Sequence, residues 1–152
     1  MLLIAVMACV AVASAAPKKV AVYVEGPISK ADKSIVSSAV MARMSGNKDY
    51  APFARNEAFL NALLKEQDYQ VSGDVPESEI RKVGGRLGVD YVIAVNVVIS
   101  SDYECHMTAE LINVETGAVL KAVSQDREYT GSSTLSAMAK NVAYRLLNRQ
   151  SK

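Results

Sequence analysis

The sequence has one histidine, two cysteines and no tryptophan among its 152 residues. Beyond residue 16 the only cysteine is Cys105, so that part of the chain cannot form an internal disulfide. There is no second histidine and no closely spaced cysteine pair, so no recognisable zinc ligand set is present. Lys and Arg total 17 against 16 Asp and Glu, without the basic excess that nucleic-acid binding requires. We therefore expect no metal, no other cofactor and no nucleic-acid partner.

Charge is missing from the start of the chain, because all 33 charged side chains (17 + 16) lie at Lys18 or beyond. Residues 1–16 read MLLIAVMACVAVASAA. This run is shorter than the roughly 20 apolar residues of a membrane-spanning helix and is typical of a signal-peptide core. Small residues at Ala13 and Ala15 suit signal peptidase, with cleavage after Ala15 or Ala16. We expect residues 1–16 to be a cleaved export signal, although a buried N-terminal strand or helix is the alternative.

Cys9 raises a second possibility for the same segment. Val6-Met7-Ala8-Cys9 loosely resembles a lipoprotein cleavage box, in which the cysteine becomes the lipidated first residue. The apolar run continues past Cys9 to a better cleavage site, which favours loss of this cysteine with the signal. We therefore expect membrane anchoring only if Cys9 is lipidated, and a periplasmic or outer-membrane-associated protein in either case.

Residues 17–152 contain no linker, low-complexity tract or repeat, so they predict a single domain. Alternation predicts a strand at 19–25, and three-four spacing predicts a helix that Ser29 caps. The following patterns predict an edge strand at 49–54, helices that begin near Asn56 and Pro76, strands at 91–99, 103–114 and 118–129, and a helix at 133–148. This order predicts an α/β fold with a mixed sheet, a C-terminal three-stranded antiparallel meander and about four helices packed on it.

Two of these strands carry specific expectations. Residues 91–99 are apolar on both alternations except at Asn96, so we expect a central strand covered on both faces. In the next strand Cys105 should face the core and His106 the solvent, because neighbouring residues on a strand point to opposite faces. That geometry excludes a catalytic Cys-His pair. Glu104 and Glu110 share the solvent face, where we expect separately solvated carboxylates.

Glycines are concentrated in the segment Gly84-Gly85-Arg86-Leu87-Gly88. A phosphate-binding loop follows a strand and opens a helix, whereas this segment closes a helix and precedes a strand. We expect Gly84 and Gly85 to allow close helix packing and Gly88 to end the helix in a left-handed conformation. Gly117 is expected at a hairpin turn between the last two strands.

The last helix has a basic end, formed by Lys140, Arg145, Arg149 and Lys152. Cations at this position interact favourably with the negative end of the helix dipole. A docking patch made of Lys140, Arg145 and Arg149 is the functional alternative.

Several segments together resemble the CsgG/LpoB-like superfamily. They are Phe53-Ala54-Arg55 with the helix NEAFLNALLKEQ, then YQVSGDV, then GGRLGVDYVIAVNVV, and finally LINVETGAVL. This superfamily includes the curli-secretion lipoprotein, the lipoprotein activators of penicillin-binding proteins and the amino-terminal domain of TolB. The resemblance covers about residues 18–150, and its most specific parts are 87–92 and the turn Asn113-Val114-Glu115-Thr116-Gly117. Both are fold-making motifs, so they support a fold more than a function.

The resemblance implies a cell-envelope protein that acts by contact with an envelope protein partner and is not an enzyme. The chain departs from the family in lacking a convincing lipid-anchor cysteine and in having Ala54 where an acidic residue often precedes the arginine. It is also too short for the long amphipathic hairpins of a secretion pore. These features favour a stand-alone exported module, and the alternatives are a secreted hydrolase using carboxylates and a periplasmic small-ligand-binding protein.

Overall fold

The computed structural model describes residues 15–67 and 77–148 and contains one five-stranded sheet. The two N-terminal strands run parallel to β3, and the last three strands form an antiparallel meander. The predicted α/β fold with its mixed sheet is therefore confirmed. Across the sheet the strands are β2 (Tyr50–Pro52), β1 (Lys18–Glu25), β3 (Tyr91–Ile99), β4 (Glu104–Asn113) and β5 (Val119–Glu128).

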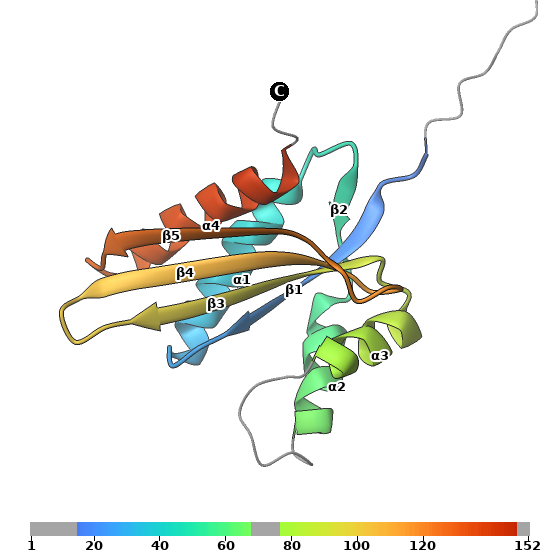
Figure 1. The fold of residues 1–152 in the computed structure, drawn as a ribbon, viewed down its shortest axis with the longest axis horizontal. Coiled ribbons are helices and arrows are strands. Elements are labelled where there is room, and N and C mark those ends of the chain that lie inside the picture. The colour runs from blue at the N-terminus through green and yellow to red at the C-terminus, as the bar shows by residue number, and fades with distance from the viewer. Residues whose placement is uncertain (1–14, 68–76, 149–152) are drawn as a thin grey trace, which may run out of the picture.

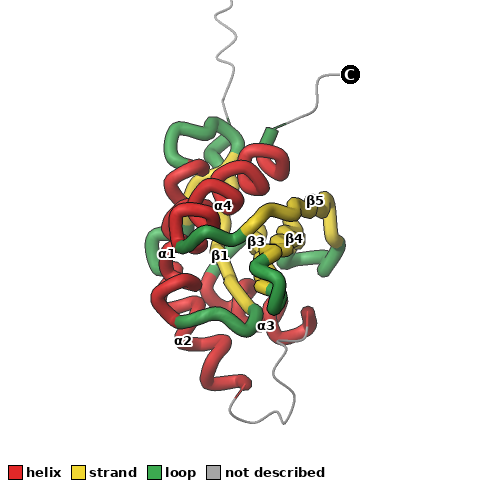
Figure 2. The backbone as a smooth tube through the Cα atoms, turned by 90° about the vertical axis from the view of Figure 1, so that its left-hand side faces the viewer, coloured by secondary structure: helices red, strands yellow, loops and turns green. Residues whose placement is uncertain are grey.

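Four helices of the described chain pack on this sheet (Figure 1). Two of them, α1 (Lys30–Met44) and α4 (Ser132–Leu147), lie side by side along one face. The other pair, α2 (Asn56–Gln67) and α3 (Glu77–Leu87), lies toward one end of the opposite face (Figure 2). None of the helices in the described ranges combines the length and apolarity needed to span a bilayer.

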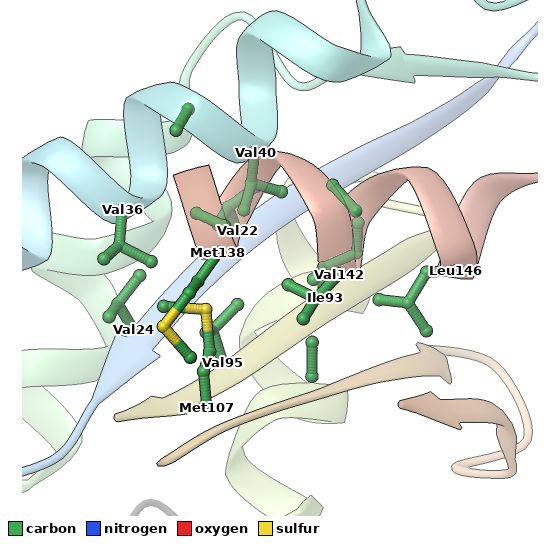
Figure 3. Packing of buried hydrophobic residues seen from close by; sticks show 14 of the residues in the cluster. Val22, Val24, Val36, Val40, Ile93, Val95, Met107, Met138, Val142 and Leu146 are labelled. Atoms are coloured by element: carbon green, nitrogen blue, oxygen red, sulfur yellow. The ribbon is translucent and has the colours of Figure 1, made fainter. Parts of the chain in front are cut away.

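The face under α1 and α4 carries the larger of two hydrophobic cores. Its side chains come from both helices and from four strands, and most of them have no exposed surface. Figure 3 shows valines of α1 and β1, Ile93 and Val95 of β3, and Met107 of β4 packing against α4. Met138 and Met107 fill the space between helix and sheet, as flexible thioethers do in irregular gaps.

The second core is smaller and covers only part of the opposite face. Phe59 and Leu63 of α2 and Val83 of α3 pack over Ala21, Val92 and neighbouring residues. Beyond this point no helix of the described chain covers β3, so Asn96 is exposed and Val98 retains 44% of its surface. The expectation that the whole strand 91–99 is covered on both faces is therefore wrong for its second half.

The helix ends follow local sequence signals. The side chain of Ser29 accepts a hydrogen bond from the backbone N–H of Asp32 at 3.0 Å, so the predicted cap is confirmed. At the end of α3, Gly88 has φ of 73°, the left-handed conformation that favours glycine. Val89 N–H donates to the carbonyl of Gly84 and Gly88 N–H to that of Gly85, at 2.9 and 3.2 Å, which is a Schellman motif.

The two helical glycines of this segment differ. A Cβ on Gly84 would lie 3.0 Å from both methyl groups of Val114, so this glycine does allow close packing. Gly85 is exposed, and a Cβ there would meet nothing within 4 Å. The packing role predicted for Gly85 is therefore wrong, because this side of α3 faces solvent.

Asn56 connects the smaller helical pair to the sheet. Its side-chain oxygen accepts from the N–H of Val22 at 2.7 Å, and its amide donates to the carbonyl of Val22 at 3.1 Å. The side chain thus continues the pairing of β2 along β1, and it does not cap α2 as expected. The helix start predicted at Pro76 and the extended piece predicted at 69–73 lie outside the described residues.

Candidate functional site

The uncovered half of the sheet forms a broad surface, which we call the open face. The register places its side chains on one side of β1, β3, β4 and β5, opposite α1 and α4. All of them are exposed or half-buried. The open face consists of Glu25, Asn96, Val98, Glu104, His106, Thr108, Glu110, Ser124, Asp126 and Glu128.

The open face carries charge of one sign, with five carboxylates and no lysine or arginine among its residues. Along β5 the sign depends on the face, because Lys121 and Arg127 share the face of the helices while Asp126 and Glu128 share the open face. Glu104 and Glu128 are direct cross-strand partners. Like charges in this position repel each other, so the surface stores unfavourable electrostatic energy that a cationic partner would relieve.

A chain of hydrogen bonds crosses the centre of the open face. The Nδ1 atom of His106 contacts Asp126 Oδ1 on the neighbouring strand, and its Nε2 lies 3.1 Å from Thr108 Oγ1. His106 and Asp126 are register partners, whereas His106 and Thr108 are two residues apart on β4. With a neutral ring, Nδ1–H donates to Asp126 and Nε2 accepts from the threonine hydroxyl. The carboxylate therefore fixes the orientation of the imidazole.

The hydroxyl of Thr108, the imidazole of His106 and the carboxylate of Asp126 stand in the order of a nucleophile, a general base and an orienting acid. The side chains of His106 and Asp126 are 53% and 69% exposed, so solvent screens their interaction. The backbone N–H groups of β4 belong to ladders with β3 and β5, which leaves this strand without donors for an oxyanion. The geometry suits a polar contact surface better than acyl transfer.

Carboxylate pairs were the other catalytic possibility. Glu104 and Glu110 lie on the same strand and face, six residues apart, which corresponds to about 20 Å. Catalytic carboxylates of glycosidases are about 5 to 9.5 Å apart. One end of the open face is hollowed and wide open to solvent. The hollow is lined by Asp102, Glu104, His106 and Asp126, together with Val98 and Ser100. These distances do not favour Glu104 and Glu110 as a catalytic pair.

Cys105 and His106 occupy opposite faces, as predicted. Cys105 is completely buried in the larger core, and His106 is exposed. Burial, and to a smaller extent the negative charge of Asp126, raises the pKa of the Cys105 thiol. A buried protonated thiol behaves as a small apolar side chain.

The predicted structural glycine of the last hairpin lies in the turn between β4 and β5. Gly117 has φ of 75°, and its N–H donates to the carbonyl of Asn113 at 2.8 Å. The Asn113 side-chain oxygen accepts from Thr116 N–H, three residues further on, at 3.0 Å and so stabilises the turn. Arg81 of α3 donates to the carbonyl of Glu115 at 2.8 Å, so this turn also anchors the smaller helical pair.

The predicted basic patch is only partly brought together. Lys140 is exposed on α4, but the guanidinium of Arg145 donates to the carbonyl of Ser124 at 2.9 Å and so joins α4 to the edge strand β5. Arg149 lies outside the described residues. The Lys121 ammonium donates to the carbonyls of Arg145 and Asn148 and caps the end of α4. Arg145 therefore has a structural contact, and a docking role for this patch stays a prediction.

Sequence reasoning missed the open face as a unit. The alternation in β4 indicated one wet side, but the contribution of β5 depends on the pairing of His106 with Asp126 and of Glu104 with Glu128. A hairpin register counted back from the turn at 113–117 would have been the usable signal, with allowance for the irregularity at 111/112.

No family model and no curated protein sequence matches the chain. Solved structures of the same fold do exist. The PelC dodecamer from Paraburkholderia phytofirmans superposes with a TM-score of 0.54 and 16% identity over 88% of this chain and 90% of that chain.

Two further structures correspond to the predicted resemblance. The LpoB C-terminal domain from Salmonella enterica has a TM-score of 0.53 and 13% identity over 74% of this chain and 84% of that chain. TolB from Acinetobacter baumannii has a TM-score of 0.54 and 12% identity over 87% of this chain but only 28% of its own length. At these identities the likeness shows the fold alone, so an LpoB- and TolB-like fold is confirmed. The likeness to the curli-secretion lipoprotein stays a prediction.

Proposed function

We propose that this protein is an exported, non-catalytic module of the bacterial cell envelope that acts by binding another protein through its open face. The uncovered half of the sheet is the observation that carries the proposal. Parallel sheets normally have both faces covered, whereas antiparallel sheets such as β3–β4–β5 commonly keep one solvated face, so it is the single sign of charge on this face that distinguishes it. Here Val98 and the surrounding carboxylates form a wide surface that suits contact with a macromolecule.

The charge of the open face indicates the kind of partner. Its five carboxylates, two of them paired directly across β4 and β5, favour a positively charged protein surface. PelC forms a dodecamer in its solved structure, so a second copy of this chain is one candidate. Light scattering after size-exclusion chromatography separates that candidate from a different partner.

Export and location rest on the sequence. The uncharged segment 1–16 and the small residues at Ala13 and Ala15 support a cleaved signal, with a mature N-terminus at Ala16 or Pro17. The resemblance to envelope lipoproteins supports a periplasmic or outer-membrane-associated protein. N-terminal sequencing of the protein from envelope fractions tests this, and a lipid-modified Cys9 would identify a membrane-anchored form.

Site-specific crosslinking tests the partner contact. A photo-crosslinking residue at Thr108 or Ser124 of the open face should yield one discrete adduct in the envelope, whereas the same residue at the exposed Ser38 of α1 should not. Glu104→Lys with Glu128→Lys should abolish the adduct, while Glu115→Lys in the β4–β5 turn should retain it. Equal adducts from Ser38 and the open face, or none at all, would contradict the proposal.

A hydrolase that uses the Thr108–His106–Asp126 chain, which differs from the carboxylate hydrolase considered from the sequence, makes a different prediction. A catalytic role for the Thr108–His106–Asp126 chain requires that Thr108→Val removes a measurable activity while leaving the crosslinked adduct intact. If Thr108→Val instead removes the adduct formed by a crosslinker at Ser124 and changes no hydrolytic activity, that result supports the binding module.

A further inference from the structure

The end of the molecule at which β1 begins and α4 ends is basic and partly apolar. The start of β1 and the end of α4 lie at the same end, as Figures 1 and 2 show. A hollow is located there, and its lining before cleavage of the expected signal also includes Ala15 and Ala16. We call this region the basic end. Its lining includes three lysines from β1, the α1–β2 loop and β5, namely Lys18, Lys48 and Lys121.

The lysines of the basic end do not have equal roles. Lys121 is occupied with the carbonyl groups at the end of α4. Lys18 and Lys48 are exposed, and within the described part of the chain their ammonium groups form no hydrogen bond or ion pair. Asp49 is the one acidic side chain in the lining, so the charge of the basic end stays positive.

Apolar side chains stand beside these charges. Leu120 lines the hollow and is 51% exposed, and its neighbour Val119 is 47% exposed. They lie at the start of β5, where the β4–β5 register is irregular. One of the five large hydrophobic residues that are exposed in the described chain, Leu120, thus shares this hollow with Lys18 and Lys48.

We infer that the basic end docks on the surface of an anionic lipid bilayer. The basic end offers both kinds of contact that such a bilayer surface accepts. The anionic headgroups attract the ammonium groups, and the boundary between headgroups and acyl chains accepts the exposed side chain of Leu120.

This inference goes beyond the proposed partner contact and does not depend on it. The basic end and the open face are different surfaces built from different residues. Docking through the basic end would fix the orientation of the protein on the bilayer and leave the open face accessible to a protein partner.

Vesicle binding by the chain of residues 17–152 tests the inference. This chain contains every described strand and helix, and it lacks the apolar segment that would insert by itself. Vesicles of phosphatidylethanolamine with about 30% phosphatidylglycerol carry negative charge and should sediment the protein. Vesicles of phosphatidylcholine carry no net charge and should not. Because salt screens exposed charges, binding should be lost at about 0.5 M NaCl.

Matched variants separate the basic end from net charge. Each basic side chain near an anionic surface increases the binding constant by about fivefold, so Lys18→Ala with Lys48→Ala should weaken binding about 25-fold. Lys30→Ala with Lys33→Ala removes the same charge about 20 Å away, at the other end of α1, and should have little effect. Leu120→Asn should weaken binding, whereas Val98→Asn on the open face should not.

Three outcomes would overturn the inference. They are absence of binding to the phosphatidylglycerol vesicles, equal weakening by the two lysine pairs, and unchanged binding of the Lys18/Lys48 variant. Loss of an envelope protein adduct in the Lys18/Lys48 variant, without any vesicle binding by the unmodified chain, would assign the basic end to a protein partner instead. None of these results affects the crosslinking test of the open face.

Discussion

The two faces of the sheet differ in how far helices cover them. Under α1 and α4 the sheet is covered by one continuous cluster from β1 to β5. On the other face α2 and α3 cover only one end, and the remaining residues of β3, β4 and β5 are mostly polar or acidic and are exposed or half-buried. The first face holds the domain together, and the second leaves a surface available for binding.

The difference is visible within a single strand. In β3, Ile93 and Val95 point into the larger core with no exposed surface, while Asn96 and Val98 emerge on the open face. Apolar residues on both alternations therefore do not by themselves bury both sides of a strand. Burial also requires a covering element, and α2 and α3 reach only as far as Val92 and Ala94.

The largest expected effect contrasts Ile93→Ala with Val98→Ala on the same strand. The first change removes a fully buried side chain and should reduce the free energy of unfolding by about 2–5 kcal/mol. The second removes a side chain that is 44% exposed and should cost less than about 1 kcal/mol. Urea denaturation of both variants measures this, and similar losses would show that the two faces do not differ in stability.

The attachment of the smaller helical pair is tested at Asn56. Asn56→Ala removes both hydrogen bonds to Val22 and leaves a buried N–H and carbonyl unpaired, so the loss should be about 2–4 kcal/mol. Asn61→Ala changes an exposed asparagine of the same helix and should be nearly neutral. Thermal unfolding followed by circular dichroism gives the two values. Equal melting temperatures for the two variants would mean that the contact with β1 is dispensable.

Two glycines of the same helix should respond with opposite signs. Gly88→Ala places a Cβ in a left-handed conformation and should destabilise the protein by about 1 kcal/mol. Gly85→Ala adds a methyl group in open space within a helix and should stabilise it by about 0.5–1 kcal/mol. Their melting temperatures should lie on either side of that of the unmodified protein. A stabilising Gly88→Ala would exclude the helix-end role of this glycine.

The smallest effect concerns Cys105, which lies in the larger core while Asp126 lies on the open face. Burial first, and the Asp126 charge second, raise the pKa of the thiol, so the native protein should react slowly with a thiol reagent at pH 8 and rapidly when unfolded. Because the unfolded state loses this proton first, the contribution of the thiol to stability is complete below its unfolded pKa and decreases above it. Asp126→Asn should accelerate labelling only slightly. Fast labelling of the native protein would contradict the burial of Cys105.

Much of the fold could be predicted from individual residues. Ser29 capped its helix, Cys105 and His106 occupied opposite sides of β4, and Gly88 ended α3 in the left-handed conformation. Each of these depends on neighbours within a few positions of the chain. The misinterpreted residues, Asn56, Gly85 and the second half of 91–99, depend on which distant element lies beside them.

The sequence by itself determined the type and order of the strands and helices, because periods of 2 and 3.6 residues are local properties of the chain. Only the tertiary structure decided that α2 and α3 stop short of Asn96, and that strand register assembles Glu104, His106, Asp126 and Glu128 into one acidic surface. These arrangements result from packing between segments far apart in the chain. A one-residue change of register would move every side chain of β5 to the other face.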